Sequence, residues 1–300
     1  MGRLELAPAA PAEWPMACRL ALGERRSDAM NTGAARLREL VQSGRFEPAG
    51  LLLAKQGGTP VGAIAAQLLP GDSGVLLPPF GLDEDIRTAL VEAAREYFRS
   101  AGTVVAHCLL LAGETEQAAP LIAGGFRYIT QIQHMLRRDS LLPEVGLTVA
   151  FEPYTETIEP VFAEILLRTY IDTLDLPETT IDRPASQQLA GYRDGQPDPP
   201  RWWLVRDASR WPIGVVMLSE LGAQEAWEIA YAGLIPEARG LGLGRALVRH
   251  CIAEAARAGI SDLGLSVDSR NFKAIRVYRD LLFRIYELQD LYLLRPDAKN

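Results

Sequence analysis

The chain has 300 residues, of which 48% are hydrophobic and 23% are charged, and its formal net charge is −7. This composition excludes a disordered or fibrous protein, and the length suffices for two ordinary domains. The acidic balance argues against general nucleic-acid binding and is compatible with a cationic substrate, although acidity more often only keeps a protein in solution.

Cysteine usage and the N-terminus favour a cytoplasmic protein. Cys18, Cys108 and Cys251 lie far apart and lack paired-ligand spacing, which favours free buried thiols over disulfides or a zinc site. Residues 1–11 contain no apolar signal-peptide core, and no run approaches about 18 apolar residues. We therefore expect a cytoplasmic localisation with no metal and no membrane or nucleic-acid partner, and the oligomeric state stays open.

In the first half of the chain, short apolar runs alternate with amphipathic segments. Strands are expected at Leu4–Ala7, Gly50–Lys55, Val61–Leu69, Val75–Leu77, Thr103–Leu111 and Tyr128–Leu136. Helices are expected at Pro11–Leu22, Ala34–Ser43, Ile86–Arg99 and Thr115–Ile122. The segment Arg138–Gly146, which has little periodicity, is predicted to be a linker.

The second half shows a similar alternation. Strands are expected at Leu147–Phe151, Trp202–Arg206, Ile213–Leu218, Ile229–Ile235, Leu263–Val267 and Ile285–Leu294. Helices are expected at Ile158–Thr173, Leu243–Ala256 and Phe272–Leu281. A polar segment, Pro177–Pro200, is predicted to be a long loop that includes a further helix.

The two halves resemble each other at a constant offset of 157 positions. Phe126-Arg127 corresponds to Phe283-Arg284, and Ala101-Gly102 corresponds to Ala258-Gly259. Further matches are Leu77 with Leu234, Pro79 with Pro236, Ala89-Leu90-Val91 with Ala246-Leu247-Val248, and Leu136 with Leu293. We infer two copies of one α/β fold with a mixed sheet, at residues 1–140 and 147–300.

The second copy contains an anion-binding pattern. The strand Ile229–Ile235 ends at Pro236, and the helix from Leu243 follows a glycine-rich turn. Glycines occupy every second position of this turn, at Gly240, Gly242 and Gly244. Glycines let backbone N–H groups approach a ligand closely, and a helix start adds unpaired donors and partial positive charge. With Arg239 and Arg245 at its rim, the turn is predicted to bind phosphate.

The first copy has lost this pattern. Residues Leu82–Arg87 stand opposite Arg239–Gly244, and they include the acidic run Asp83-Glu84-Asp85. Three carboxylates in this place should repel phosphates, and the conformational freedom of glycine is gone. Only the second copy is therefore predicted to bind a phosphorylated cofactor.

Two motifs carry a family resemblance. The run Arg239-Gly240-x-Gly242-x-Gly244 resembles the acetyl-coenzyme A motif (Gln/Arg)-x-x-Gly-x-(Gly/Ala) of the GNAT superfamily of N-acetyltransferases. The segment Asn271-x-x-Ala274-x-x-x-Tyr278 resembles the second signature of that family, about 30 residues further on. The chain is therefore similar to tandem GNAT proteins with a degenerate N-terminal copy, although Leu282 replaces the usual glycine after the second signature.

The resemblance implies acetyl-CoA as acyl-donor cosubstrate. Backbone N–H groups of residues 241–245 would bind the pyrophosphate. The strands 229–235 and 263–267 would splay apart around the pantetheine arm, and an N–H near Leu234 would bind the thioester oxygen. The cofactor-binding residues it implies are Leu234, Ile235, Pro236, Arg239, Gly240, Leu241, Gly242, Leu243, Gly244, Arg245 and Asn271.

The resemblance also implies two catalytic residues. Glu228 corresponds to the catalytic glutamate of the histone acetyltransferase branch and would be the general base, and Tyr278 would be the general acid for the departing thiolate. Strand alternation predicts that Glu228 shares a face with Ala230 and Ala232, opposite Ile229 and Tyr231.

Several alternatives stay open. Beside an N-acetyltransferase acting on a primary amine of a small molecule or protein, a mycothiol synthase-like acetyltransferase and a non-catalytic acyl-CoA sensor fit the pattern. A Rossmann dinucleotide enzyme fits less well, because the glycines have the wrong spacing and few elements remain downstream. An acidic loop with Tyr170, Asp172, Asp175 and Glu178 could select a cationic acceptor, or be only a solvated loop. His107 and His250 are predicted to have packing roles.

Overall fold

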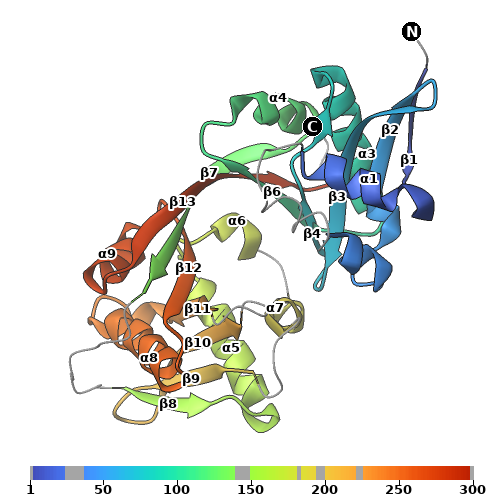
Figure 1. Ribbon diagram of the computed structural model, residues 1–300. Coiled ribbons are helices and arrows are strands. Elements are labelled where there is room, and N and C mark those ends of the chain that lie inside the picture. The colour runs from blue at the N-terminus through green and yellow to red at the C-terminus, as the bar shows by residue number, and fades with distance from the viewer. Residues whose placement is uncertain are drawn as a thin grey trace. The chain divides into compact units, whose positions relative to one another are not determined.

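The computed structural model describes residues 3–23, 37–138, 149–180, 184–193, 200–220 and 226–297. The chain forms two units: residues up to Thr130 together with those from Gln289 onward, and residues Gln131–Leu288. Figure 1 shows both, each with helices packed on a sheet. No helix in the described ranges is long and apolar enough to cross a membrane.

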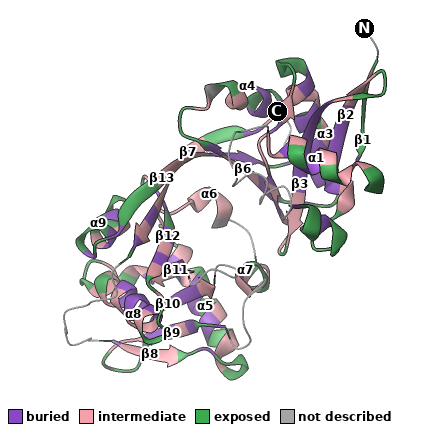
Figure 2. Ribbon diagram, viewed as in Figure 1, coloured by how far each residue is buried: buried purple, intermediate pink, exposed green. Residues whose placement is uncertain are grey.

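The first unit is a mixed sheet with strand order β1-β2-β3-β4-β6-β13. Its pairs are antiparallel apart from the parallel pair β4–β6. Its strands are β1 (Leu4–Pro8), β2 (Leu51–Gln56), β3 (Thr59–Leu69), β4 (Ser73–Leu76), β5 (Phe80–Gly81, paired with β3), β6 (Val105–Leu111) and the end of β13 (Arg284–Leu294). Its helices include α1 (Trp14–Ala21), α3 (Glu84–Ser100) and α4 (Thr115–Ala123). Residues 37–42 of the predicted helix Ala34–Ser43 are also helical, and residues 34–36 lie outside the described residues. Two buried clusters hold the unit together, one around Phe98 and Phe126 and one around Phe46 (Figure 2).

The second unit has strand order β7-β12-β11-β10-β9-β8, with β11–β12 as its parallel pair. Its strands are the end of β7 (Arg127–Arg137), β8 (Ala150–Pro153), β9 (Trp202–Arg206), β10 (Pro212–Glu220), β11 (Ala226–Leu234) and β12 (Asp262–Asp268). Its helices are α5 (Glu159–Tyr170), α6 (Pro177–Thr180), α7 (Ala185–Arg193), α8 (Leu243–Arg257) and α9 (Phe272–Asp280). These elements confirm the predicted strands and helices of this unit, with ends shifted by a few residues, and the segment predicted as a loop with one further helix contains two, α6 and α7. Residues 147 and 148 of the first predicted strand lie outside the described residues.

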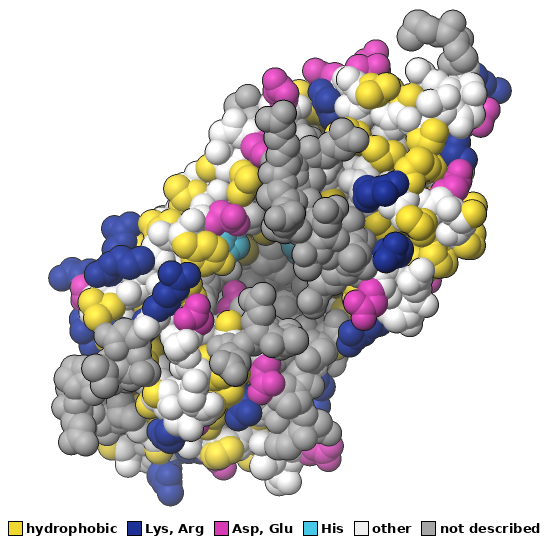
Figure 3. Space-filling model, in the orientation of Figure 1, with side chains coloured by type: hydrophobic (Ala, Val, Ile, Leu, Met, Phe, Trp, Pro, Cys, Tyr) yellow, Lys and Arg dark blue, Asp and Glu magenta, His cyan; other side chains and the backbone are white. Residues whose placement is uncertain are grey.

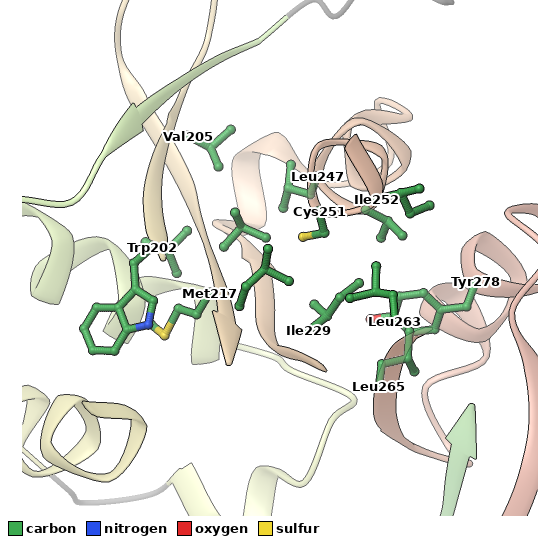
Figure 4. Close-up of a cluster of buried hydrophobic side chains, with 14 of the residues drawn as sticks. Trp202, Val205, Met217, Ile229, Leu247, Cys251, Ile252, Leu263, Leu265 and Tyr278 are labelled. Carbon is green, nitrogen blue, oxygen red and sulfur yellow. The ribbon is translucent and has the colours of Figure 1, made fainter. Parts of the chain in front are cut away.

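Helices α5 and α8 cover opposite faces of the second sheet. Trp202 stacks on Phe162 of α5, and the next residue, Trp203, packs edge-on against His250 of α8. Successive side chains of a strand point to opposite faces, so the two helices lie on different sides. Figure 4 shows side chains from both sides of this core, with Leu247, Cys251 and Ile252 on α8 and Trp202 and Met217 away from that helix. All three cysteines are free and buried, as predicted.

The predicted repeat is visible in the elements themselves. The elements β6, α4 and β7 begin at residues 105, 115 and 127, and β12, α9 and β13 begin at 262, 272 and 284, each 157 positions later. The lengths of these three pairs are also equal. The parallel pair β4–β6 joined by α3 matches the parallel pair β11–β12 joined by α8. The chain is therefore a tandem repeat of one α/β fold.

Each unit ends on a strand from the other half of the sequence. Residues 132–137 of β7 pair with β12 in the second unit, and residues 289–294 of β13 pair with β6 in the first. Buried Arg137 of β7 donates a hydrogen bond to the carbonyl of Leu281. The units therefore differ from the ranges 1–140 and 147–300, and of the predicted linker, residues 139–146 lie outside the described residues.

The turn after α9 keeps its shape without the expected glycine. Leu282 adopts φ +68°, the left-handed region, as its counterpart Gly125 does with φ +94°. A non-glycine residue in this region costs roughly 1–2 kcal/mol. The neighbouring Phe283 is fully buried, so the packing of its ring holds the strained turn in place.

Candidate active site

The glycine turn of the second unit has the geometry of an open anion site. Gly240 and Gly242 have φ +79° and +78°, and Gly242 is the N-cap of α8. Within the part of the chain that the structure describes, the N-cap makes no side-chain hydrogen bond to this helix start, because Gly242 has no side chain. A Cβ atom added at Gly240, Gly242 or Gly244 would meet nothing within 4 Å. The helix start therefore presents backbone donors to open space, as anion binding requires.

The corresponding helix start in the first unit is closed by its own carboxylate. Asp83 is the N-cap of α3, and its Oδ1 accepts a hydrogen bond from Ile86 N at 2.8 Å. Glu84 and Asp85 add negative charge to the same turn. An acidic side chain thus occupies the place where a phosphate would bind in the second unit.

Both arginines of the predicted rim have protein partners. The guanidinium of Arg239 donates to the carbonyls of Leu234 at 3.0 Å, Thr169 at 2.9 Å and Asp172 at 3.3 Å. Arg245 forms an ion pair with Asp280 of α9 at 2.6 Å. Arg239 therefore ties the end of β11 to the end of α5, which fixes the glycine turn relative to the sheet.

Strands β11 and β12 separate where the resemblance requires a gap. Their register pairs Ala226 with Asp262 and ends at Ile229 with Leu265. Beyond Ile229, β11 continues to Leu234 on β10, whereas β12 continues to Asp268 on β7. The backbone of residues 230–234 therefore faces a gap between β11 and β12. The family resemblance implies such a gap, with the two strands splayed apart.

Backbone alternation decides which groups of β11 face this gap. The N–H of Ile235 donates to the carbonyl of Ile213 at 3.0 Å, on the β10 side. Because backbone groups of a strand alternate in direction, those of Ala232 and Leu234 point to the opposite edge. The carbonyl of Leu234 accepts from Arg239, so the N–H groups of Ala232 and Leu234 are the donors aimed into the gap.

A bulge in β11 changes the predicted faces. Met217 is opposite Tyr231 and Leu218 is opposite Ile229, so Ala230 is an extra residue in the register. Tyr231 therefore points to the α5 face, where its hydroxyl lies 2.7 Å from the hydroxyl of Thr169. The predicted alternation, with Tyr231 on the face of Ile229, is wrong because the bulge resets the side-chain period.

Glu228 lies on the same face as Tyr231, half-buried. Its Oε1 accepts a hydrogen bond from Ser266 Oγ of β12 at 3.1 Å. The residue opposite Glu228 on β12 is Gly264, which leaves room for the carboxylate to reach along the strand to Ser266. Burial raises the pKa of the Glu228 carboxyl, and this outweighs the lowering by Ser266 and by the charge of His134. A carboxylate with a raised pKa accepts a proton more readily near neutral pH.

Tyr278 is buried on α9, within the core that Figure 4 shows beside Leu263 and Leu265. Burial, with added repulsion from Asp175, raises the pKa of its hydroxyl, which therefore stays protonated at neutral pH. Asn271 begins the same helix, and its Oδ1 accepts from Ala274 N at 3.3 Å. Asn271 thus has a local capping role that orients the helix carrying Tyr278.

The acidic loop is tied to the end of β12. The Asp175 carboxylate accepts from Asp268 N at 2.9 Å, and Arg270 forms two hydrogen bonds with Glu178 at 2.7 and 2.9 Å. Arg270 also pairs with the fully buried Asp268 at 2.6 Å. Burial raises the pKa of Asp175 to about 6. Glu178 and Asp175 therefore have partners within the protein, which weakens the prediction that they select a cationic acceptor.

His250 packs inside the second unit, as predicted. Its ring stacks on Phe151 at 3.7 Å and meets Trp203 edge-on at 4.7 Å. Burial lowers the pKa of His250 to about 4, although Glu254 acts in the opposite direction. His107 is half-buried in the first unit, and the loss of solvent around its ring lowers its pKa.

This packing predicts a pH dependence of stability. The pKa of His250 is depressed in the folded state, so between pH 6.5 and about 4 the unfolded chain binds the extra proton. Stability is therefore lost as the pH falls through this window, by about 3 kcal/mol at most for this one group. In urea unfolding at pH 4.5 and pH 7, His250→Phe should reduce the difference between the two pH values. An unchanged difference would contradict the assignment.

Sequence reasoning did not single out two polar residues near Glu228. Ser266 contacts Glu228 directly, and His134 of β7 lies 3.0 Å from Ser266. Alternation along the expected strand 263–267 was the available signal for Ser266, two residues from Gly264. No local signal exists for His134, because its strand comes from the first half of the chain.

The site combines a parallel strand pair that separates, a glycine turn at a helix start and a buried tyrosine. Residues 164–283 match the family model described as acetyltransferase (GNAT) family, so this part of the chain is a GNAT domain.

A curated relative and two solved structures are similar to this chain. Mycothiol acetyltransferase of Thermomonospora curvata is 29% identical over 226 residues, which are 69% of this chain and 68% of that protein. A GCN5-related N-acetyltransferase from Sphaerobacter thermophilus superposes with a TM-score of 0.70 at 17% identity, covering 99% of this chain and 97% of the other. A tandem GNAT protein from the clavulanic acid biosynthesis pathway has a TM-score of 0.60 at 18% identity, covering 99% and 100%.

Proposed function

We propose that the second unit transfers an acetyl group from acetyl-CoA to a primary amine. The observation that carries this proposal is the position of Glu228 on β11, whose following residues face the gap left by β12 and lead into the uncapped glycine turn. The turn suits a pyrophosphate, because a helix start with unpaired N–H groups binds phosphate. Figure 3 shows Lys and Arg side chains gathered over α9, which also favours an anionic ligand nearby.

Acetyl-CoA, when bound, supplies the activated acetyl thioester. Glu228 accepts the proton that the attacking amine loses, because its carboxyl is half-buried and has a raised pKa. The N–H groups of Ala232 and Leu234 donate to the thioester oxygen as negative charge develops there. Tyr278 donates its phenolic proton to the departing sulfur, and its raised pKa keeps that proton available.

For the acceptor, we favour a small neutral or weakly charged amine over a polycation. Glu178 and Asp175 have internal partners, whereas aromatic rings gather near Tyr231: Tyr170 at 5.5 Å and Tyr192 at 5.9 Å. Aromatic faces pack against apolar and C–H surfaces, such as those of a sugar ring. The identity with mycothiol acetyltransferase supports an amino-sugar conjugate of this kind as the acceptor.

A thermal shift with acetyl-CoA, followed by thiol release with an amine panel, tests the proposal. The panel contains deacetylated mycothiol, a polyamine, an aminoglycoside and a lysine peptide. We expect stabilisation by acetyl-CoA, and release with deacetylated mycothiol in preference to the polyamine. Absence of stabilisation would overturn the cofactor assignment, and preference for the polyamine would overturn the acceptor assignment. Binding of acetyl-CoA without turnover of any amine would favour the non-catalytic sensor.

A further inference from the structure

Three polar side chains form a row across three neighbouring strands of the second unit. His134 of β7 is directly opposite Ser266 of β12, and its Nδ1 lies 3.0 Å from Ser266 Oγ. Ser266 Oγ in turn donates to Glu228 Oε1 of β11 at 3.1 Å. The row therefore connects β7, the strand that the first half of the sequence supplies to this unit, with Glu228, the proposed base.

The hydrogens of this row have a single consistent arrangement. A serine hydroxyl has one hydrogen, and here it is donated to the carboxylate of Glu228. The short contact between Ser266 Oγ and His134 Nδ1 then requires a hydrogen on Nδ1, which donates to Ser266. Each member thus donates toward Glu228, which favours the charged form of the carboxylate against the larger, opposite effect of burial.

The unit without a glycine turn lacks this row. At the offset of 157, His134 corresponds to Leu291 and Ser266 corresponds to Leu109. Leu291 and Leu109 are directly opposite each other on β13 and β6, as His134 and Ser266 are on β7 and β12. The same two positions of the repeated fold are therefore apolar in one unit and hydrogen-bonded in the other. The sheet itself does not require polar residues there.

We propose that His134 is a positioning residue for the acetyl transfer, acting through Ser266 on the carboxylate of Glu228. This proposal rests on the proposed role of Glu228 as base. His134 would orient the Ser266 hydroxyl and place positive charge near the carboxylate, so that Glu228 keeps one rotamer and accepts protons over a wider pH range. The exchanged strand β7 would thereby contribute to the chemistry of a site whose other residues come from the second half of the chain.

Charges around the row are consistent with this role. Burial raises the pKa of Glu228, whereas the Ser266 hydrogen bond and the charge of His134 lower it. From β13, the ring of Tyr286 lies 6.1 Å from His134, and burial, Glu287 and Glu228 raise the pKa of its hydroxyl. Tyr286 therefore adds no charge to the row, and His134 is the neighbouring group whose charge lowers the pKa of Glu228.

The test compares pH profiles of kcat/KM for the full chain and its variants, with the amine that the panel selects. His134→Leu should lower the plateau about tenfold, since it removes a hydrogen bond in a chain that ends on a charged group. It should also move the acidic limb to higher pH. His134→Asn keeps a side-chain N–H near the place of Nδ1, so its plateau value of kcat/KM should be close to that of the unaltered protein. Its acidic limb should still lie at higher pH, because asparagine carries no charge. Ser266→Ala should resemble His134→Leu.

Gln133→Leu is the matched control. Gln133 is the preceding residue of β7, points to the opposite face and donates to Ser269 Oγ at 3.2 Å. This variant should leave both plateau and limb unchanged. Thermal unfolding and the affinity for acetyl-CoA show whether each variant is folded. If His134→Leu does not fold, His134→Asn and Ser266→Ala carry the test.

Two further measurements separate this proposal from the role of Glu228. In the Glu228→Gln background, His134→Leu should cause no further loss, because the group it positions is already gone. The chain has three histidines, so the His134 imidazole signal in an NMR spectrum is assigned by its loss in His134→Asn, and Glu228→Gln should shift it at fixed pH. If Glu228→Gln turns over slowly and His134→Leu turns over normally, the positioning role of His134 is overturned, whereas Glu228 remains the proposed base. Normal turnover of Glu228→Gln would overturn the base assignment itself.

Discussion

Glu228→Gln is expected to lower kcat/KM for acetylation by about 10²- to 10⁴-fold, the usual contribution of a positioned general base. Glutamine keeps the size of the side chain and its capacity to accept from Ser266, but it does not take a proton from the attacking amine. The affinity for acetyl-CoA should stay the same, since the glycine turn is untouched. Initial rates of thiol release across pH, together with a binding titration, measure both effects.

The acidic limb of kcat/KM in the unaltered protein should report the Glu228 carboxyl. The base acts only when it is deprotonated, so the rate falls as the pH drops through its pKa, which burial raises above the ordinary value. Glu220→Gln is the matched control. Glu220 is on the neighbouring strand β10, opposite Trp227, and so lies on the other face of the sheet. Glu220→Gln removes the same charge and should keep full activity. An equal loss of kcat/KM in both variants would contradict the role of Glu228.

Local signals predicted most of the fold. Apolar runs and amphipathic segments identified the elements of both units, and the constant offset of 157 positions predicted equivalent elements that begin at equivalent residues. The glycine turn was also predictable, because glycine adopts the φ of +78° found at Gly242 without steric cost. The loss of this turn in the first unit followed from Asp83, whose carboxylate does cap α3.

The features that the sequence did not predict depend on contacts between residues that lie far apart in the chain. The bulge at Ala230 depends on how β11 pairs with β10, and it turns Tyr231 to the face of α5. The partners of Arg239 include a carbonyl of Thr169, 70 positions earlier in the chain. His134 reaches the site because β7 pairs with β12. None of these contacts has a periodicity that a window of neighbouring residues could reveal.

The exchanged strands give the degenerate copy a structural role in the other unit. The second sheet ends on residues 132–137, which the first half of the sequence supplies, and the first sheet ends on residues 289–294 of the second half. Neither half of the sequence therefore contains all the strands of its own unit. A copy that has lost its glycine turn still supplies a strand to the unit that has kept one.

Gly242→Asp is expected to weaken acetyl-CoA binding about 10- to 100-fold. The added carboxylate would lie at the start of α8, where the backbone donors face open space, and would repel the pyrophosphate by roughly 1–4 kcal/mol at about 4 Å. It would also accept hydrogen bonds from the helix start, as Asp83 does in the first unit. Isothermal titration with acetyl-CoA measures the change.

Two variants separate charge from backbone strain in this result. Gly242→Asn introduces a side chain of the same size without the charge, in a residue that tolerates the left-handed region, so its affinity should lie much closer to that of the unaltered protein. Gly259→Asp places the same carboxylate at φ +76°, also with open space around it, just beyond the other end of α8. It carries the same strain and should bind acetyl-CoA normally. Equal weakening in Gly242→Asp and Gly259→Asp would show that strain in α8, and not an anion site at its start, controls the affinity.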